Sequence, residues 1–247
     1  MKRNHDFVIV GAGVFGAWIA RCLRRNGASV ALVDAYGPAN SRSSSGGETR
    51  VIRMGYGPDE LYTRMAQRSF PAWEELELQL GAELIHRTGV LWLSNDSDEY
   101  TTAMQDVFIR NQIQCERLDG AILRQRYPQL AFDDVTWGLL EPGSGLLMAR
   151  RAVQLLVFEL EKSGMAYLHE KVLAPPSSGK VDELRTDNGR AVSGGQFIYA
   201  CGPWLPKIFP ALLGDRVFPS RQEVFFLGTP MGDTSFRPPN MPGEKTT

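Results

Sequence analysis

The chain has 247 residues, a net charge of −1 at pH 7 and 43% hydrophobic residues, a composition typical of folded globular proteins. This balance of charge gives no reason to expect a nucleic-acid or acidic-lipid partner. The three cysteines, Cys22, Cys115 and Cys201, form no CxxC pair, which argues against a disulfide framework or a zinc site. No apolar run is long enough for a transmembrane helix, so we expect a cytoplasmic protein with no membrane partner.

The segment Phe7–Asp34 combines an apolar strand, a glycine-rich turn, a helix and a second apolar strand. Gly11, Gly13 and Gly16 give the turn its GxGxxG spacing. In dinucleotide-binding βαβ units, the first glycine permits the tight turn and the second lets a pyrophosphate approach the backbone. The third lets the helix and the strand pack closely, and the helix N-terminus favours phosphate. We therefore predict a dinucleotide-binding site at this turn.

The acidic residue at the end of the second strand narrows the choice of nucleotide. Asp34 stands where a carboxylate can accept hydrogen bonds from ribose hydroxyls. An acid at this position disfavours a phosphorylated ribose, so FAD or NAD is expected rather than NADP. The fingerprint alone does not choose between FAD and NAD.

The region after this fingerprint lacks the regular alternation of strands and helices expected for a plain NAD dehydrogenase. A Ser- and Gly-rich loop at residues 37–47 is followed by the charged and apolar segment Glu48–Arg53. Apolar residues then recur at helical spacing over residues 59–80. Within this helix, Pro71 is expected to cause a kink or a break near residues 68–70.

The middle of the chain predicts a series of short elements. They are a strand at Thr88–Ser94, a surface helix at Asp98–Ile113, a short helix at Asp119–Arg126, a turn between two short strands within Thr136–Met148, a helix at Ala152–Ser163 and a strand at Tyr167–Leu173. The stretch from about residue 86 to residue 137 has the pattern of an insertion, after which the sheet pattern resumes.

The last part of the chain contains a second junction of strand, glycine and helix. A hairpin is expected at Leu184–Val192. The strand Gln196–Ala200 then leads to Gly202, and ligands often bind at the carboxyl ends of such strands. The residues alone leave this junction open between a ligand site and an ordinary turn. One more strand is expected at Glu223–Leu227, before a polar tail at residues 228–247.

These segments together resemble the D-amino-acid-oxidase/glycine-oxidase superfamily of FAD-dependent oxidoreductases, and most closely its monomeric sarcosine oxidase-like branch. The segments that carry the likeness are FVIVGAGVFG at residues 7–16, SSSGGETRVIRMGYG at 43–57, TGVLWL at 88–93, EPGSGLL at 141–147 and YACGPWLPKI at 199–208. The resemblance implies an α/β fold with a discontinuous, Rossmann-like FAD-binding domain. It also implies a second, α+β substrate domain that is incomplete at the C-terminus.

The resemblance implies domain boundaries that alternate along the chain. The FAD-binding domain would take residues 1–85 and 139–214, and the substrate domain would take residues 86–138 and 215–247. The family's chain continues well beyond residue 247. We therefore expect that the part supplying further substrate contacts, and in some members a cysteine tether for the flavin, lies outside this chain.

The resemblance also implies roles for individual residues, with FAD as the cofactor and no metal. The cofactor residues would be Gly11, Gly13, Val14, Phe15, Gly16, Asp34, Ala35, Ser44, Ser45, Arg50, Val172, Gly202 and Trp204. Arg53 would pair with the substrate carboxylate, since a guanidinium fork can hold a carboxylate through two hydrogen bonds, and Arg50 is the other candidate catalytic residue. Sarcosine oxidases carry two histidines where this chain has Ser45 and Gly46, a departure that counts against sarcosine itself.

The expected activity is oxidation of the C–N bond of a small amino acid or N-alkyl amino acid, with oxygen as the acceptor. Two alternatives stay open. The chain could be a truncated FAD-binding fragment without turnover, because its tail would leave the substrate-domain sheet with unpaired strands. It could also be an NAD-linked Rossmann dehydrogenase. A monomer is compatible with the sequence, which does not decide the oligomeric state.

Overall fold

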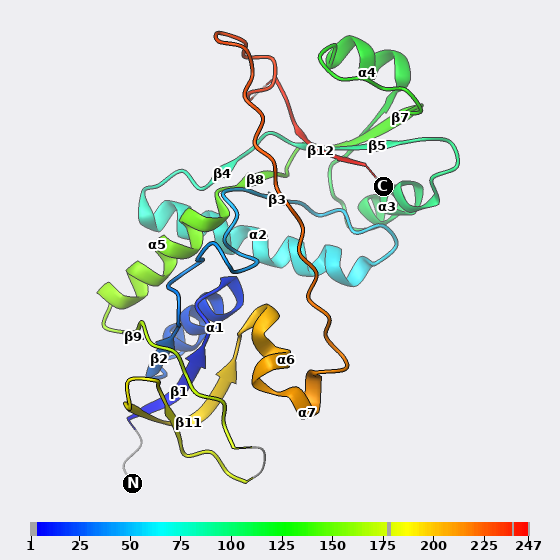
Figure 1. Cartoon of the computed structure of the whole chain (residues 1–247). Coiled ribbons are helices and arrows are strands. Elements are labelled where there is room, and N and C mark those ends of the chain that lie inside the picture. Colours follow the sequence, from blue (N-terminus) through cyan, green and yellow to red (C-terminus); the bar gives the residue numbers. More distant parts are fainter. Residues whose placement is uncertain (1–3, 177–178, 239, 247) are drawn as a thin grey trace. The chain divides into compact units, whose positions relative to one another are not determined.

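The computed structural model describes residues 4–176, 179–238 and 240–246. The chain forms two compact units, residues 1–48 with 149–223 and residues 49–148 with 224–247 (Figure 1). Each unit is built from two stretches that lie far apart in the sequence. The predicted boundaries of a FAD-binding and a substrate domain, after residues 85, 138 and 214, stay a prediction.

The first unit contains a five-stranded sheet in the order β10-β11-β1-β2-β9. Its strands are β1 (His5–Val10), β2 (Val30–Val33), β9 (Ala166–Leu168), β10 (Glu183–Arg185) and β11 (Ala191–Tyr199). The strands β11, β1, β2 and β9 run parallel, whereas β10 pairs with β11 as the predicted antiparallel hairpin. Val8, Val10, Ala31 and Val33 are buried in the core of this sheet. The expectation of an α/β fold with a Rossmann-like parallel sheet is confirmed.

Helices α1 (Val14–Arg25) and α5 (Ala149–Lys162) contact each other in the first unit. α1 connects β1 to β2 and completes the predicted βαβ unit. Arg24 and Arg25 lie in its last turn, where basic side chains are favoured by the negative end of the helix dipole. α5 carries a buried apolar face and begins at Ala149, slightly before the predicted start.

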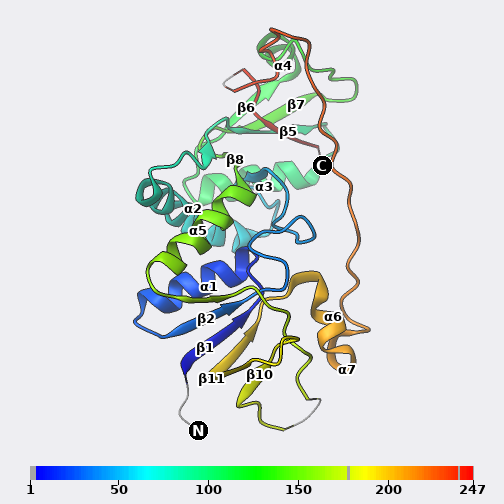
Figure 2. The ribbon, with the colours of Figure 1, turned by 60° about the vertical axis from the view of Figure 1, so that its left-hand side comes forward.

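The carboxyl end of β11 leads into helical structure, as the second strand–glycine–helix junction predicts. A 3₁₀ turn, η1 (Gly202–Trp204), is followed by the short helices α6 (Leu205–Ile208) and α7 (Pro210–Leu213), which Figure 2 shows in orange after β11. The predicted strand at residues 167–173 is shorter than expected, because β9 ends at Leu168.

The second unit contains two sheets, a four-stranded one in the order β12-β5-β7-β6 and a three-stranded one in the order β3-β8-β4. The strands are β3 (Arg50–Ile52), β4 (Ile85–His86), β5 (Val90–Ser94), β6 (Glu116–Asp119), β7 (Trp137–Glu141), β8 (Gly145–Leu147) and β12 (Gly243–Thr246). The predicted strand at residues 88–94 is confirmed as β5, which is buried along its whole length. β7 and β8 follow each other closely in the chain, yet they pair in different sheets.

Helices α2 (Glu60–Leu80), α3 (Glu99–Arg110) and α4 (Gly120–Arg126) belong to the second unit. The aspartates that precede α3 and α4 cap these helices, since Asp98 and Asp119 each accept two backbone N–H bonds of the first turn. Such caps stabilise a helix by about 1 kcal/mol. The predicted helices at residues 98–113 and 119–126 are therefore confirmed, although α3 ends at Arg110.

Of the kink or break expected at Pro71, the break is wrong, because α2 continues across this proline to Leu80, and the kink stays a prediction. A proline inside an isolated helix costs about 3 kcal/mol. Phe70, Trp73 and Leu76 are buried on α2, and burying each such side chain stabilises the fold by about 1.5–3 kcal/mol. Tertiary packing therefore outweighs the local cost of the proline.

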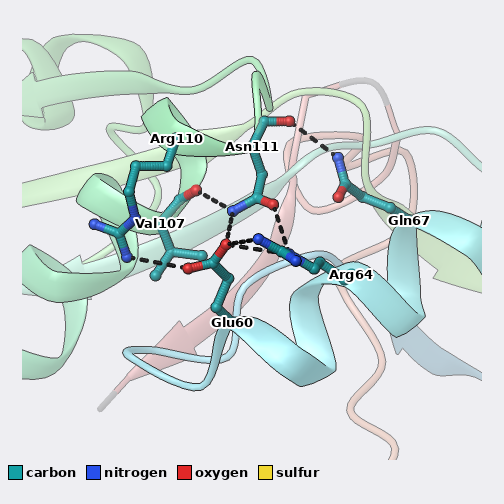
Figure 3. Close-up of polar contacts among 6 residues, drawn as sticks. All are labelled: Glu60, Arg64, Gln67, Val107, Arg110 and Asn111. Carbon is teal, nitrogen blue, oxygen red and sulfur yellow. Dashed lines mark hydrogen bonds and ion pairs between the residues drawn. The ribbon is translucent and has the colours of Figure 1, made fainter.

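Glu60, in the first turn of α2, gathers polar side chains from α2 and from the end of α3 (Figure 3). Its carboxylate accepts hydrogen bonds from Asn111 Nδ2 at 3.0 Å and from Arg64 Nη2 at 2.6 Å. Arg110 Nη2 lies 3.4 Å from the other oxygen. These donors, Asn111 first, lower the pKa of the Glu60 carboxyl. Because both arginines are exposed, solvent weakens the ion pairs, and the cluster serves mainly to connect α2 with α3.

The strand predicted at Glu223–Leu227 is wrong. Residues 217–230 are coil, which Figure 1 shows in orange. Phe225, Phe226 and Leu227 are 78%, 70% and 91% exposed. A strand needs a neighbouring strand for its backbone hydrogen bonds, and among the described residues no strand pairs with this segment.

Candidate functional site

The turn between β1 and α1 is shaped by glycines that leave no room for a side chain. Gly11 has a φ of 108°, and a Cβ atom there would lie 2.4 Å from the carbonyl oxygen of Ala200. A Cβ atom on Gly16 would lie 1.8 Å from the carbonyl oxygen of Gly11. The first turn of α1 therefore packs directly on the backbone that follows β1, and only glycine fits both positions without a backbone shift.

Gly13, the N-cap of α1, borders the side chain of Ser45. A Cβ atom on Gly13 would meet Ser45 Oγ at 3.4 Å as its nearest neighbour. The Val14 N–H donates to Ser45 Oγ at 2.9 Å, and the first-turn N–H groups have no partners within the helix. No acidic residue lies in the first turn of α1 itself, where the positive end of the helix dipole favours an anion. This arrangement suits an anionic diphosphate.

Asp34, directly after β2, is bonded to the backbone through both of its carboxylate oxygens. Oδ2 accepts a hydrogen bond from the Ala12 N–H at 2.7 Å, and Oδ1 accepts one from the Tyr36 N–H at 2.8 Å. The carboxylate thus holds the glycine turn against the chain that follows β2, including Ala35. Each oxygen keeps a second lone pair, which can accept a hydrogen bond from a ribose hydroxyl.

The Ser- and Gly-rich loop folds closely on itself and reaches α1 through Ser45. A Cβ atom on Gly46 would lie 2.1 Å from the carbonyl oxygen of Asn40. Arg150 of α5 donates to Gly46 O from Nε at 2.7 Å and also from Nη2. The sequence gives no signal for Arg150, because its partner is a main-chain oxygen far away in the chain. Ser44, the neighbouring predicted residue, is exposed.

Two further predicted residues lie at the carboxyl end of β11. Gly202 has a φ of 48°, and a Cβ atom there would meet no other atom within 4 Å. The ring of Trp204 lies 5.9 Å from the ring of Tyr36, which follows β2. Trp204 and the chain after Asp34 are thus brought together. Val172 forms an isolated β-bridge and packs against the core of the same sheet.

Cys201, between β11 and Gly202, is held in its thiol form. Its Sγ donates to Val10 O at 3.3 Å. Burial, followed by the negative charge of Asp34, raises the pKa of the thiol to about 12. A thiol with such a pKa is a poor nucleophile at neutral pH, so Cys201 is a structural residue.

The predicted catalytic arginines lie in the second unit, whereas the other predicted cofactor residues all lie in the first. Arg53 follows β3 and donates from Nη1 to Gly55 O at 2.6 Å. Its guanidinium carbon lies 4.6 Å from the ring centre of Tyr56 and 4.7 Å from that of Trp92. Contact with two aromatic rings orients the guanidinium. Arg50, within β3, is exposed and donates from Nη1 to Thr49 O.

Glu141, at the end of β7, is a buried acid that was not among the predicted site residues. It is 1% exposed. Its Oε1 accepts from Trp92 Nε1 at 2.8 Å, and its Oε2 accepts from the Met54 N–H at 2.9 Å and from Ser144 Oγ at 2.8 Å. Burial raises the pKa of this carboxyl, while the three donors and the charge of Arg53 oppose the rise. The sequence signal that could have indicated this residue is an acidic residue at the end of an apolar strand, directly before a Pro-Gly turn.

A family-level sequence profile, described as DAO, FAD dependent oxidoreductase, matches residues 6–246. The chain belongs to this family. It is 27% identical over 207 residues to the peroxisomal sarcosine oxidase of Mus musculus, covering 84% of this chain and 53% of that relative. It is 25% identical over 211 residues to the N-methyl-L-tryptophan oxidase of Yersinia pestis (strain Pestoides F), covering 85% and 56%. The chain thus spans about half the length of these curated relatives.

A solved structure extends the likeness over the whole chain. The L-proline dehydrogenase from P. horikoshii superposes with a TM-score of 0.76 at 16% identity, covering 100% of this chain and 65% of that chain. At this identity the likeness shows the fold alone.

The cofactor of this family is FAD, so the prediction of FAD is confirmed and the NAD-linked alternative is wrong. The residues of the first unit fit the diphosphate of FAD. A Cβ atom on Gly13 would contact only Ser45 Oγ, the first turn of α1 contains no acid, and Asp34 retains acceptor capacity beside the turn. This fit rests on main-chain geometry, which the glycine spacing had indicated.

Proposed function

We propose that this chain carries the FAD site and the substrate-carboxylate site of an enzyme that oxidises the C–N bond of a small amino acid or N-alkyl amino acid, with oxygen as the acceptor. The observation that carries the proposal is the Arg53 guanidinium, oriented over Tyr56 and Trp92. The mouse and Yersinia relatives are named for sarcosine and N-methyl-L-tryptophan, and both compounds carry a carboxylate next to an N-methylated amine.

The proposal assigns the FAD site to the ends of β1, β2 and β11, to the loop before β3, to Arg50 of β3 and to Val172 after β9. Its residues are Gly11, Gly13, Val14, Phe15, Gly16, Asp34, Ala35, Ser44, Ser45, Arg50, Val172, Gly202 and Trp204. The N-terminus of α1 binds the diphosphate, and Asp34 accepts hydrogen bonds from the ribose. Bound FAD supplies the electron acceptor for the oxidation.

Arg53 holds the substrate carboxylate. A guanidinium has five N–H donors, of which one Nη1 donor is used by Gly55 O. The remaining donors suffice for a bidentate pair with a carboxylate. Fixing the carboxylate in this way orients the α-carbon of the substrate and removes rotational freedom before the reaction, which is a large part of catalysis in oriented systems.

The experiment is to purify the chain, measure bound flavin by its absorbance, and assay peroxide release with sarcosine, N-methyl-L-tryptophan, glycine and L-proline. We expect about one flavin per chain and peroxide from at least one of these compounds. A folded chain that binds no flavin would overturn the proposal.

Arg53→Ala tests the carboxylate site directly. Two charge-assisted hydrogen bonds are lost, so the substrate concentration for half-maximal rate should rise about 100-fold or more while flavin content is unchanged. Arg117→Ala is the matched control, because the Arg117 guanidinium lies 3.7 Å from the ring centre of Trp137 and outside the proposed site. An unchanged substrate requirement in Arg53→Ala would remove Arg53 from the site.

A second candidate is an FAD-binding chain without turnover. It is favoured by the exposed apolar segment at residues 224–227, which has no strand partner among the described residues. A yellow protein that releases no peroxide with any of the compounds above would favour this candidate over the oxidase.

We also propose that the protein works in the cytoplasm. Its cysteines, Cys22, Cys115 and Cys201, are all free thiols, as expected in a reducing compartment. Among the described residues, no helix is both long and apolar enough to cross a membrane. Fractionation of the native cells with an antibody against the chain tests the assignment, and recovery in another compartment would contradict it.

A further inference from the structure

We propose that Glu141 is a positioning residue for Arg53: its two carboxylate oxygens hold the backbone and the aromatic ring on which the guanidinium depends. The inference rests on the proposed role of Arg53 in carboxylate binding. It deepens that role by naming the group that fixes the geometry of the arginine.

Each oxygen of Glu141 holds a different support of Arg53. Oε2 accepts from the N–H of Met54, the residue directly after Arg53, at 2.9 Å. This bond fixes the peptide next to the point where the arginine side chain leaves the backbone. Oε1 accepts from Trp92 Nε1 at 2.8 Å, and the same indole lies 4.7 Å from the guanidinium carbon.

Burial prevents solvent from replacing the hydrogen bond between Trp92 and Glu141. Glu141 is 1% exposed, and Trp92 is fully buried at 0%. A buried donor that loses its acceptor keeps its full desolvation cost, since no water can take the acceptor's place. The Trp92 Nε1–H therefore requires an acceptor at position 141, and the part-buried Met54 N–H shares the same carboxylate.

A carboxylate is suited to this position because it accepts at both ends. In a glutamine, one end of the amide is an NH₂ group, which can only donate. The Ser144 hydroxyl can rotate and accept from that NH₂ group, but the Met54 and Trp92 donors cannot reverse. Glu141→Gln must therefore leave one of the two supports of Arg53 unpaired, with almost no change in side-chain volume.

The charge of Glu141 has the opposite effect on binding. The negative charge of Glu141 interacts with the charge of Arg53 and so competes with a substrate carboxylate, and its removal alone would strengthen binding. The positioning role predicts that the loss of orientation outweighs this gain. Trp92→Phe removes the indole N–H and part of the ring beside the guanidinium but keeps the negative charge of Glu141, so it weakens a support of Arg53 without removing charge.

The experiment measures binding of acetate, a carboxylate that cannot be oxidised at a C–N bond, to the FAD-loaded full chain. The probe is the Arg53 Nε–H resonance in a nitrogen-15 NMR spectrum, assigned by its loss in Arg53→Ala. The variants are Glu141→Gln and Trp92→Phe. The matched control is Ser144→Ala, which removes a donor to Glu141 without touching the supports of Arg53.

We expect Glu141→Gln and Trp92→Phe each to shift the Arg53 resonance in the absence of acetate and to weaken acetate binding about tenfold, with flavin content unchanged. Ser144→Ala should stay within about twofold of the wild type. A role of Glu141 in folding alone would leave the acetate affinity of the folded variants unchanged.

The outcomes separate this inference from the proposed function. If the wild type binds acetate and Glu141→Gln binds it equally well or more tightly, the positioning role is overturned while the role of Arg53 stands. If Glu141→Gln does not fold, Trp92→Phe decides, and an unchanged affinity in that variant overturns the inference. If the wild type itself gives no response to acetate, the carboxylate site falls, and the inference falls with it.

Discussion

The cofactor turn of the first unit and the arginine site of the second unit are built in different ways. The turn between β1 and α1 is made by main chain, and its key positions, Gly11 and Gly16, are defined by the absence of a side chain. The site around Arg53 is made by side chains, with Trp92 and Glu141 as its support. A phosphate-binding site made from backbone N–H groups does not require particular side chains. An oriented guanidinium requires supporting side chains from several strands.

This difference teaches where each site is vulnerable. A site made of backbone is sensitive to an added side chain, because the neighbouring main chain can make room only through an unfavourable backbone shift. A site made of side chains loses affinity stepwise, because each lost hydrogen bond removes one of the contacts that orient the binding group. The predictions below test this contrast.

The largest effect is expected for Gly16→Val. The new Cβ atom would lie 1.8 Å from the carbonyl oxygen of Gly11, so the turn must shift. We expect the free energy of unfolding to fall by about 3 kcal/mol or more and FAD binding to be lost. Urea unfolding and flavin absorbance measure the two effects. Gly143→Ala is the control, since a Cβ atom there meets nothing within 4 Å; equal stability of the two variants would contradict the packing argument.

Gly13→Ala separates binding from folding within the same turn. Its Cβ atom would meet only Ser45 Oγ, at 3.4 Å, so the fold should lose no more than about 1 kcal/mol. The same methyl group stands where the diphosphate approaches, and the Kd for FAD should rise about 100-fold. Titration of the flavin-free chain with FAD, followed by fluorescence, gives the Kd. Retention of wild-type affinity would show that the diphosphate lies elsewhere.

The pH dependence of stability tests the burial of Glu141. Burial raises the pKa of this carboxyl in the folded chain, so the folded state binds the proton more tightly than the unfolded state. Its contribution to stability is therefore complete below the unfolded pKa of about 4.3 and is lost as the pH rises through the higher folded pKa. Because Glu141→Gln lacks this titration, its stability deficit should shrink as the pH rises above the unfolded pKa, as measured by urea unfolding. A deficit that grows with pH would show that the folded pKa is lowered.

The smallest effect is expected for Ser45→Ala, a side-chain change at the backbone site. The Val14 N–H loses the acceptor that Ser45 Oγ provides at 2.9 Å, but the diphosphate can take its place. FAD affinity should change by no more than about fivefold. Ser43→Ala in the same loop is the control, since its hydroxyl donates to Asn40 O rather than to α1. A loss as large as that of Gly13→Ala would mean that the cofactor turn depends on side chains after all.

The parts of the fold that were predicted correctly depend on residues close together in the chain. The βαβ unit from β1 to β2 follows from glycine spacing and apolar runs, and the caps at Asp98 and Asp119 act within one helical turn. The β10–β11 hairpin likewise follows from its turn residues.

The parts that were missed depend on distant partners. Residues 223–227 have a strand-like pattern but no neighbouring strand among the described residues. Helix α2 continues across Pro71 because Phe70 and Trp73, on either side of it, are buried in the tertiary structure. A local sequence pattern predicts neither outcome, because strand pairing and side-chain burial depend on residues that are distant in the sequence.

By itself, the sequence determined the glycine turn, the acid at Asp34 and the family, because these signals act through the backbone or through neighbouring residues. Only the tertiary structure decided that Arg53 lies over Tyr56 and Trp92 and that Glu141 bonds to both supports of this arginine. The physical reason is burial. A carboxylate hidden from water must be satisfied by donors from separate strands and loops, and these meet only when the sheets have formed.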